Sequence, residues 1–531
     1  MTGPSPRVRA VADGSLLVEY PGAADEEANQ AAVGLAAGLR ARGPEGLLDT
    51  VAGARTLFCS FRPERLEYAA LVRAIDGAAR TSDEAIAKRT HRIPVLYGGE
   101  AGPDLALLAG RAGASEEEFA RRHAAPAYRV AFLGFAPGFA YMTGLFAGLD
   151  APRHATPRPR VPGESVALAG GYTGIYPEPG PGGWNLIGRA AARLFDPGAR
   201  RPALFEPGDE VRFEQQDPES FARALARMPS AAPLPPLAGA PVFRVEKAGL
   251  SSVVCGAPRH GRGAIGVPPS GAMDWSALAG GNGVLGNPPG AAALEAAVAG
   301  PALEVLDDCE IATAGAPCDA RVDGREIPYG TPVRVLRGAR VTIGSVHMGV
   351  RSYLCVGGGL SVSPAPGIPA RLAAGDVLFA HGPAPEGPPG PREALAPFAA
   401  APWDTVVRIV LGPQEDRFPK EGISTLLDSP FRVSSTSDRR GIRLEGPPLA
   451  HTAGADIPPE GTALGAIQVP ADGNPIVLGP DRPVTGGYAK IASVIGADFS
   501  LVAQARPGST LRFQAVSVEE AVRARGRMRW L

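Results

Sequence analysis

The chain has 531 residues, a formal net charge of −1 and 45% hydrophobic residues. Such a charge gives no global attraction to nucleic acid or to an anionic membrane, so neither is expected as a partner. No run of about 18 or more apolar residues occurs, and the first residues lack the continuous apolar segment of a signal peptide, so we expect a cytoplasmic protein without a membrane span. The cysteines are scattered without a C-x-x-C pair, which predicts reduced thiols and neither a disulfide framework nor a zinc site. They are Cys59, Cys255, Cys309, Cys318 and Cys355.

The chain is rich in turn-forming residues, with 69 glycines and 56 prolines. That content is compatible with disorder, but the hydrophobic content and the regular apolar runs favour folded, turn-rich β structure. We therefore predict a mainly β protein with barrel-like modules and one α+β domain at the N-terminus.

The first 95 residues predict that α+β domain. Alternating apolar residues predict strands over 15–20 and 54–61, and helical spacing predicts helices over 26–42 and 65–76. A strand–helix–strand order of this size is typical of a small α+β sandwich.

Residues 96–228 are predicted to form a β-barrel that a helix closes. Asp217 is placed to cap that helix and Pro218 occupies its first position. The proline-rich stretch 229–241 then predicts a semi-rigid linker. Two further barrels are expected over 242–400 and 401–531, with a second proline-rich stretch at 381–397 between them.

Two segments 300 residues apart follow one plan. The stretches 207–228 and 507–528 both predict a turn, a strand that ends in Phe, and a capped helix. In the second copy, Ser517 and Glu520 predict a capping box. We call the similarity of 207–228 to 507–528 the long repeat. The tripeptide GGY also occurs twice, at 170–172 and 486–488, but a match of three residues arises by chance far more easily than the long repeat does. The positions that match are Pro207/Pro507, Gly208/Gly508, Arg212/Arg512, Phe213/Phe513 and Met228/Met528.

Several common motifs are absent or out of context. The stretch "GNGVLG" (281–286) fits G-x-G-x-x-G, but a predicted helix precedes it and two prolines follow it, so it lacks the strand and the helix that a dinucleotide site needs. There is no Walker loop, no G-x-S-x-G elbow and no histidine pair with metal-ligand spacing, so no metal centre is expected.

The densest polar signal lies in residues 151–188. Arg153, Arg158 and Arg160 fall within eight residues, and planar guanidinium groups suit carboxylates or phosphates. Before them, "FLGFAPGFAYMTGL" (132–145) crowds aromatic residues with glycines. We interpret this stretch as backbone bent around a ligand that aromatic side chains enclose. A surface arginine cluster and a packed barrel corner are the alternatives. The proposed aromatic walls are Phe139, Tyr141, Tyr172, Tyr176 and Trp184.

Long motifs in both halves resemble two companion families. "YRVAFLGFAPGFAYMTGL", "PRHATPRPRVPGESVALAG", "TGIYP" and "PGGWNLIGR" resemble the allophanate hydrolase subunit 1 family, which includes the B component of 5-oxoprolinase. "GVPPSGAMD", "SDRRGIRLEG", "GAIQVPADGNPIVL" and "TGGYAKIASVIGADF" resemble the subunit 2 family, which includes the C component of 5-oxoprolinase and the carboxyltransferase part of urea carboxylase. The chain thus resembles a natural fusion of the B and C components, and the resemblance implies cyclophilin-like β-barrels.

The resemblance implies ATP-dependent hydrolysis of the cyclic amide 5-oxo-L-proline to glutamate, together with the A component of 5-oxoprolinase as a separate protein. ATP, with Mg²⁺, would be the cofactor, and no biotinylation motif is present, so no covalent biotin is expected on this chain. Homo-oligomer formation is left open. The alternatives are a biotin-dependent carboxyltransferase acting on urea-like amides and a non-catalytic regulator of a histidine kinase. The catalytic candidates are Arg158, Arg160, Asp481 and Tyr488, and the substrate-binding candidates are Arg153, Gly486, Gly487 and the five aromatic residues named above.

The second half departs from the family pattern at several positions. Cys255 and Gly256 stand where a Gln-Asp pair is usual, and Pro483 and Val484 replace Gln and Thr. Because amide side chains both donate and accept hydrogen bonds, their loss predicts an altered substrate preference.

Overall fold

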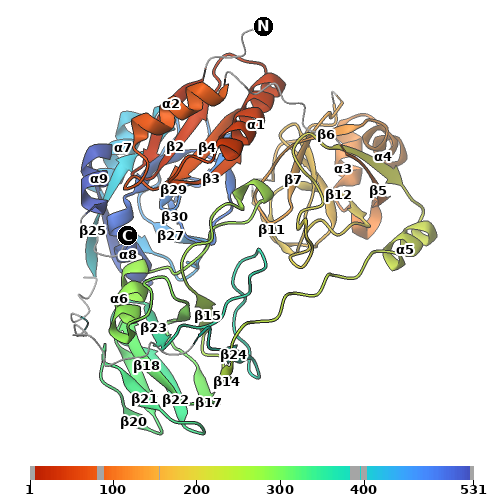
Figure 1. The fold of residues 1–531 in the computed structure, drawn as a ribbon. Helices are drawn as coiled ribbons and strands as arrows, with labels where there is room; N and C mark the ends of the chain where they lie inside the picture. Colours follow the sequence, from red (N-terminus) through yellow and green to blue (C-terminus); the bar gives the residue numbers. More distant parts are fainter. Residues whose placement is uncertain are drawn as a thin grey trace.

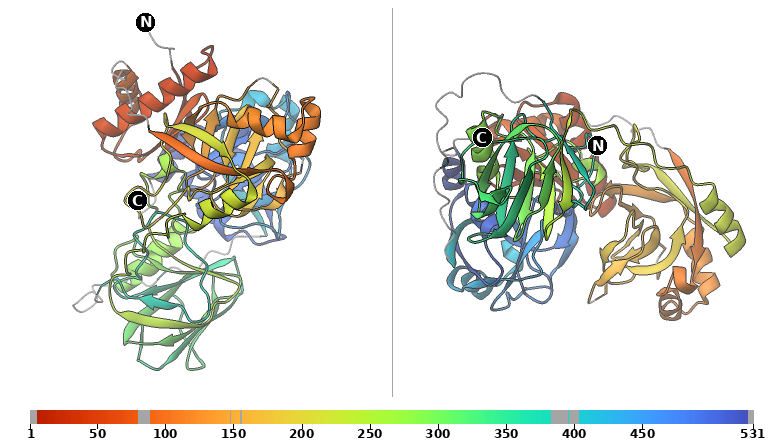
Figure 2. Two further views of the ribbon diagram at one scale, coloured as in Figure 1. Left: turned by 90° about the vertical axis from the view of Figure 1, so that its right-hand side faces the viewer. Right: turned by 90° about the horizontal axis from the view of Figure 1, so that it is seen from below.

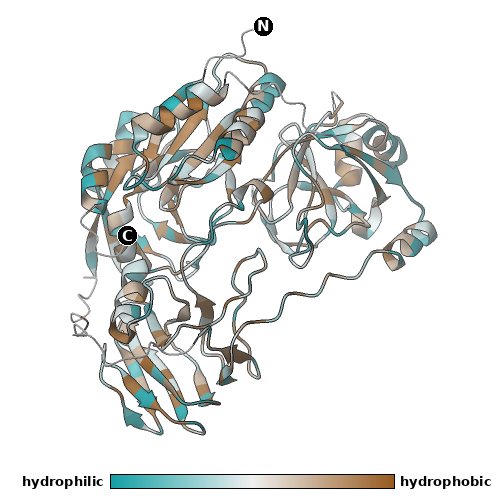
Figure 3. Ribbon diagram, in the orientation of Figure 1, coloured by the Kyte–Doolittle hydropathy of each residue, from teal (hydrophilic) through white to brown (hydrophobic). Residues whose placement is uncertain are grey.

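A computed structural model describes residues 6–79, 89–146, 148–154, 156–382, 395 and 403–526. The chain forms four modules (Figure 1). The N-terminal module lies against the C-terminal barrel, the second module projects to one side of them, and the third lies below. The segment after α5 runs back from the second module to the third (Figures 1 and 2). Apolar residues occur along strands of every module, whereas helices such as α4 (Glu116–Ala124) and α9 (Val518–Arg525) are largely hydrophilic (Figure 3).

The N-terminal module is a four-stranded antiparallel sheet covered by two helices. The order is β1-β2-β4-β3, and Leu16, Leu35, Leu57 and Leu71 meet in its core. Both strands and both helices with predicted ranges are present, and the sheet contains two further strands, β1 and β3, for which no range was predicted. Its elements are β1 (Arg7–Ala12), β2 (Ser15–Glu19), α1 (Asp25–Arg42), β3 (Leu47–Ala52), β4 (Thr56–Phe61) and α2 (Tyr68–Ala79).

The second module is a closed barrel, and the next strand, β5, already belongs to it. The expected boundary at residue 95 therefore falls inside this strand. The barrel strands are β5 (Thr90–Tyr97), β6 (Tyr128–Leu133), β7 (Ala140–Thr143), β9 (Ser165–Ala169), β10 (Tyr172–Ile175), β12 (Asn185–Ala190) and β13 (Glu210–Gln215). Outside the barrel lie η1 (Gly99–Ala101), α3 (Leu105–Arg111), α4 (Glu116–Ala124), the two-stranded arm of β8 (Arg158–Val161) and β11 (Gly180–Gly182), and the closing helix α5 (Pro218–Ala226).

The fourth module is a closed barrel of the same kind. The barrel of the second module is called the first barrel below, and that of the fourth module the second barrel. Its strands are β25 (Asp404–Leu411), β26 (Phe431–Val433), β27 (Gly441–Glu445), β29 (Ala466–Gln468), β30 (Ile476–Leu478), β32 (Lys490–Val494) and β33 (Thr510–Ala515). Around it lie η3 (Glu415–Arg417), α7 (Lys420–Asp428), η4 (Gly496–Asp498), α8 (Phe499–Gln504), α9 (Val518–Arg525) and the arm of β28 (Asp456–Gly461) and β31 (Thr485–Tyr488).

The two barrels share one topology, strand for strand. In each, the last strand pairs in parallel with the first strand and antiparallel with the second. Gly208 and Gly508 both adopt positive φ before that last strand, and each donates its N–H to the second strand of its barrel. The long repeat is thus confirmed over the described residues, while Met528 lies outside them. The Asp217 cap and the Ser517–Glu520 capping box are confirmed as well.

The two GGY tripeptides do not occupy equivalent positions in the two barrels. Residues 170–172 form the turn into β10, whereas residues 486–488 lie in β31, the topological counterpart of β11. A chance match of three residues is the explanation that fits.

The third module differs from the expected barrel. It is built from a six-stranded sheet in the order β20-β19-β22-β17-β14-β24 and a five-stranded sheet in the order β15-β16-β23-β18-β21, which α6 (Trp275–Leu285) covers. "GNGVLG" lies at the end of this helix, with Gly286 as its left-handed cap, so it is no phosphate loop. The strands are β14 (Pro241–Lys247), β15 (Ser251–Cys255), β16 (Ala293–Ala297), β17 (Ala302–Val305), β18 (Cys309–Gly315), β19 (Cys318–Val322), β20 (Arg325–Glu326), β21 (Val333–Val335), β22 (Arg340–Val346), β23 (Arg351–Val356) and β24 (Val377–Phe379), with η2 (Gly263–Ile265) in the connection from β15 to α6.

The 381–397 stretch falls mostly outside the described residues. Within the described residues, no helix is long and apolar enough to cross a membrane.

Candidate active site

The arm of β28 and β31 brings the two barrels into contact. The backbone N–H of Phe135 donates to Thr485 Oγ1 at 2.9 Å, and this hydroxyl lies 3.4 Å from the Tyr141 hydroxyl. A Cβ at Gly134 would overlap the Thr485 side chain. The glycine in the 132–145 stretch therefore allows the second barrel to approach, while Phe135 itself takes a positive φ of 64°.

The aromatic residues near this contact pack mainly on one another. Phe139 lies 5.0 Å from Tyr141, 5.3 Å from Trp184 and 5.5 Å from Tyr176 between ring centroids, and only 1% of its surface is exposed. Tyr172 packs edge-on against Tyr141 at 5.7 Å. This geometry favours the packed barrel corner over open walls around a ligand, and the substrate-binding roles of these five residues stay predictions.

Arg153 and Tyr488 meet across the same contact. The guanidinium carbon lies 5.9 Å from the ring centroid, and Arg153 Nη1 lies 3.5 Å from Asp456 Oδ1. Asp456 is opposite Tyr488 in the arm, and a Cβ at Gly487 would collide with the guanidinium. Sequence reasoning named Arg153, Gly487 and Tyr488 separately in the two halves, and the fold brings them together.

Arg158 and Arg160 do not join this group. Arg158 Nη2 contacts Asp104 Oδ1 at 2.7 Å within its own barrel. Burial opposes ionisation of Asp104, but hydrogen bonds from Arg158 and from the Leu186 N–H hold its pKa below the usual value. The side chain of Arg160 is exposed and makes no hydrogen bond or ion pair with another described residue. Arg158 thus has a structural partner, and the catalytic roles of both arginines stay predictions.

Asp481 lies in a buried ion-pair network that joins the third module to the second barrel. Arg439 Nε contacts Asp481 Oδ2 at 2.7 Å and Arg439 Nη1 contacts Glu295 Oε1 at 2.6 Å, while the Ser270 hydroxyl donates to Asp481. Burial raises the pKa of Glu295, but Arg439 and Arg351 lower it by more, so its carboxylate is ionised. Both oxygens of Asp481 are already engaged, which fits a positioning role better than the general-base role considered from the sequence.

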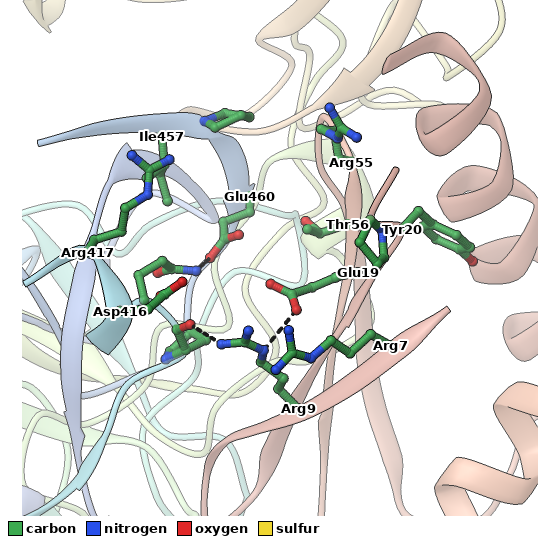
Figure 4. Close-up of a pocket in the computed structure, with 14 residues that line it drawn as sticks. Arg7, Arg9, Glu19, Tyr20, Arg55, Thr56, Asp416, Arg417, Ile457 and Glu460 are labelled. Atoms are coloured by element: carbon green, nitrogen blue, oxygen red, sulfur yellow. Dashed lines mark hydrogen bonds and ion pairs between the residues drawn. The ribbon is translucent and has the colours of Figure 1, made fainter. Parts of the chain in front are cut away.

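A polar cavity of about 300 Å³ opens on the other side of the arm, between the N-terminal sheet and the second barrel (Figure 4). Glu460, which lies opposite Gly486 in the arm, forms part of its wall. Its Oε1 lies 2.7 Å from Lys490 Nζ and accepts from Gln414 Nε2 at 2.8 Å. The ionisable lining comprises Arg7, Arg9, Arg55, Arg417, Glu19, Asp416 and Glu460.

Charges of both signs face one another in this cavity. Arg9 Nε contacts Glu19 Oε2 at 3.0 Å and its Nη1 donates to the Pro413 carbonyl at 2.7 Å. Burial raises the pKa of Glu19 although Arg9 opposes the rise, and Glu460 and Asp416 add to it. Arg417 makes no ion pair with a described residue, so its guanidinium is available to an anion.

Lys490, Glu460 and Gln414 were missed from the sequence. Lys490 directly follows the TGGYA segment and is only 1% exposed, although it begins a mostly apolar barrel strand. A lone lysine at the start of such a strand is the signal that could have found it, because lysine is rarely buried without a partner.

The chain contains two barrels of one topology, each with a two-stranded arm, and its sequence matches the class of carboxyltransferase-domain proteins. Residues 6–205 match the family model "Carboxyltransferase domain, subdomain C and D", and residues 265–515 match "Carboxyltransferase domain, subdomain A and B". The chain belongs to the family of the 5-oxoprolinase B and C components, with both components joined in one polypeptide.

The relatives agree with this layout. The 5-oxoprolinase B component of Escherichia coli O157:H7 is 50% identical over 124 residues, which are 23% of this chain and 57% of that protein. The 5-oxoprolinase C component of E. coli K12 is 32% identical over 292 residues, which are 54% of this chain and 94% of that protein. The structure superposes on a crystal structure of TTHA0988 with a TM-score of 0.82 and 36% sequence identity. The match covers 96% of this chain and all of that chain. The predicted fusion and the mainly β, barrel-containing fold class are confirmed.

Proposed function

We propose that the chain supplies the fused B and C components of an ATP-dependent enzyme that opens 5-oxo-L-proline to glutamate, together with a separate A component. The proposal is supported by the similarity of its two halves to the B and C components of 5-oxoprolinase. The location of the substrate site is inferred from the polar cavity, which contains the ion-paired Glu460 and an Arg417 guanidinium that can bind an anion (Figure 4).

The chemistry of a lactam acid matches that lining. Arg417 and Arg7 would bind the ring carboxylate, since guanidinium groups pair well with carboxylates. Glu460, positioned by Lys490 and by the Gln414 amide, would accept the lactam N–H. A cavity of about 300 Å³ suits a small cyclic amide.

Transfer of the γ-phosphoryl group of ATP to the amide oxygen would make the ring carbonyl carbon a better electrophile. Water would then add to that carbon and the C–N bond would break, which gives glutamate, ADP and inorganic phosphate. The described residues contain neither a glycine-rich phosphate loop nor a cluster of three His, Cys, Asp or Glu that could hold a metal ion. In this proposal the A component binds ATP and Mg²⁺, and the residues of this chain hold the cyclic amide. Homo-oligomer formation and cytoplasmic localisation stay predictions.

The test is to purify the chain with and without the A component of a 5-oxoprolinase and to measure ATP hydrolysis that depends on 5-oxoproline. We expect activity only with both proteins. Arg417→Gln should raise KM at least tenfold, because a charge-assisted hydrogen bond is worth about 1.5–3 kcal/mol. Arg443→Gln, at an exposed position of the same barrel, is the matched control. Wild-type kinetics in folded Arg417→Gln protein would remove Arg417 from the substrate site.

The carboxyltransferase family match favours a second candidate, biotin-dependent carboxyl transfer to a urea-like amide. It needs a biotin carboxylase and a biotinyl carrier on other chains. Activity with urea and those two proteins, and none with 5-oxoproline and the A component, would establish this alternative. The kinase-regulator alternative predicts no turnover in either assay.

A further inference from the structure

We propose a second ligand site, distinct from the cavity of Figure 4, that binds a small monocarboxylate with an apolar body. It is a cavity of about 370 Å³ at the junction of three modules: the β1–β2 turn, the 257–275 connection and the second barrel. The other cavity lies toward the opposite end of β1, around Arg7 and Arg9.

The walls of this junction cavity are largely apolar. The N-terminal module contributes Phe58 and Phe61, the connection contributes Met273, and the second barrel contributes Phe499. An apolar lining with few polar groups is typical of sites for small organic ligands.

Arg482 is the polar group that determines the charge of the ligand. Only 7% of it is exposed, and its Nε donates to the Thr462 carbonyl at 3.1 Å. No carboxylate lies within ion-pair distance of its guanidinium among the described residues. Burial lowers the pKa of Arg482 to about 10, although the carboxylates of Asp49 and Asp481, beyond ion-pair distance, oppose the shift, so the group is still cationic at neutral pH. A buried, unmatched cation is costly and favours an anionic ligand.

Two further polar atoms in the cavity lack partners. His260 Nδ1 and Trp275 Nε1 are buried without a hydrogen bond in the described structure. Burial, reinforced by Arg482, Arg62 and Arg525, lowers the pKa of His260 to about 4, so the imidazole is neutral and the local potential is positive. The indole N–H can donate to a ligand oxygen.

Most of the remaining charges at the rim neutralise one another. Arg525 Nε contacts Glu64 Oε1 at 2.7 Å and its Nη1 lies 3.6 Å from Asp13 Oδ2. Arg62 at the rim is exposed to solvent and makes no ion pair with a described residue, which leaves Arg482 as the buried cation of the cavity without an ion-pair partner. One buried cation within largely apolar walls favours a monocarboxylate with an apolar body over a strongly hydrated phosphate dianion.

The walls are held in place independently of any ligand. Asp49 accepts from the Gly261 N–H at 3.0 Å and from the Gly263 N–H, which positions the loop that carries His260. Ser270 is buried with a strained φ of 54°, and its hydroxyl donates to Asp481. Backbone strain of this kind tends to gather at ligand sites.

The experiment uses the full-length protein and benzoate as the probe, followed by calorimetry and by tryptophan fluorescence. We expect saturable benzoate binding, with benzamide and inorganic phosphate at least tenfold weaker, as the loss of one charge-assisted bond predicts. Arg482→Gln, whose amide can still donate to Thr462, should weaken benzoate binding about tenfold or more, whereas Arg482→Lys should weaken it less. Arg443→Gln and Arg417→Gln should leave it unchanged.

Three results would overturn the proposal: no saturable binding of benzoate, equal binding of benzamide, or unaltered binding by folded Arg482→Gln protein. If Arg482→Gln does not fold, Trp275→Phe provides the second test. It should abolish the fluorescence response and weaken benzoate binding, and an unchanged calorimetric affinity together with an unchanged fluorescence response would place the ligand elsewhere.

Discussion

Arg153 of the first barrel lies over the ring of Tyr488 in the second, 5.9 Å from its centroid. The two residues are more than 300 positions apart, and the arm of β28 and β31 brings them together. The contact therefore reports whether the two halves are docked.

The backbone at Gly134 lies so close to Thr485 that a larger residue there should disturb the docking of the two halves. Gly134→Ala places a methyl group against the Thr485 side chain and should destabilise the protein by about 1–3 kcal/mol, as overpacking does. Thermal unfolding measures the loss. Gly110→Ala is the control, because a Cβ there meets nothing within 4 Å. The cost should shrink in a Thr485→Gly background, and an equal cost would disprove the direct clash.

The two halves should stay associated when the linker is cut. Besides the Thr485 contact, the Ala54 N–H donates to the Pro459 carbonyl at 2.7 Å and Asp49 binds the Gly261 N–H. Limited proteolysis within 229–240 followed by gel filtration should give one peak that contains both fragments. Two separate monodisperse peaks under native conditions would contradict an interlocked unit.

Arg158 and Arg160 should respond differently to truncation. Arg158→Ala leaves the mostly buried Asp104 without its arginine partner and should cost about 1–3 kcal/mol. Arg160→Ala should change the free energy of unfolding by less than about 0.5 kcal/mol, since the side chain is exposed. Urea unfolding measures both. A large loss of turnover in stable Arg160→Ala protein would support the catalytic role predicted from the sequence.

His123 predicts acid sensitivity of the first barrel. Burial lowers its pKa to about 3, and its ring nitrogens bind Tyr97 and Thr173 at 2.8 and 2.9 Å. Between pH 6.5 and about 3 the unfolded chain binds the proton and the folded chain does not, so this contribution is complete above pH 6.5 and falls by up to about 1.4 kcal/mol per pH unit below it. The difference in unfolding free energy between wild type and His123→Gln, measured from pH 7 to 4.5, isolates this slope from carboxylates that titrate in the same range. A constant difference would mean that His123 titrates normally.

Gly256 should not accept the Asp that related proteins are expected to carry. A Cβ there would lie 2.8 Å from the Gly290 carbonyl oxygen and 3.0 Å from the Ala292 Cα. Gly256→Asp should therefore lower the melting temperature, with a cost of about 1–3 kcal/mol or more, while Gly110→Asp should cost less. An unchanged melting temperature would show that this strand end can shift.

Local patterns in the sequence determined the elements and the architecture class. Apolar alternation placed β2 and β4, helical spacing placed α1 and α2, and the cap signals of Asp217 and Ser517 were correct because capping involves only neighbouring residues. The long repeat between 207–228 and 507–528 likewise indicated that two modules share the same final strand and helix. Only the tertiary structure decided the partners of the candidate residues. It paired Arg158 with Asp104, engaged Asp481 with Arg439, and placed Arg153 beside Tyr488 and Lys490 beside Glu460. Those pairings depend on how separate modules dock, and docking is set by shape and burial across long sequence separations, which no local pattern encodes.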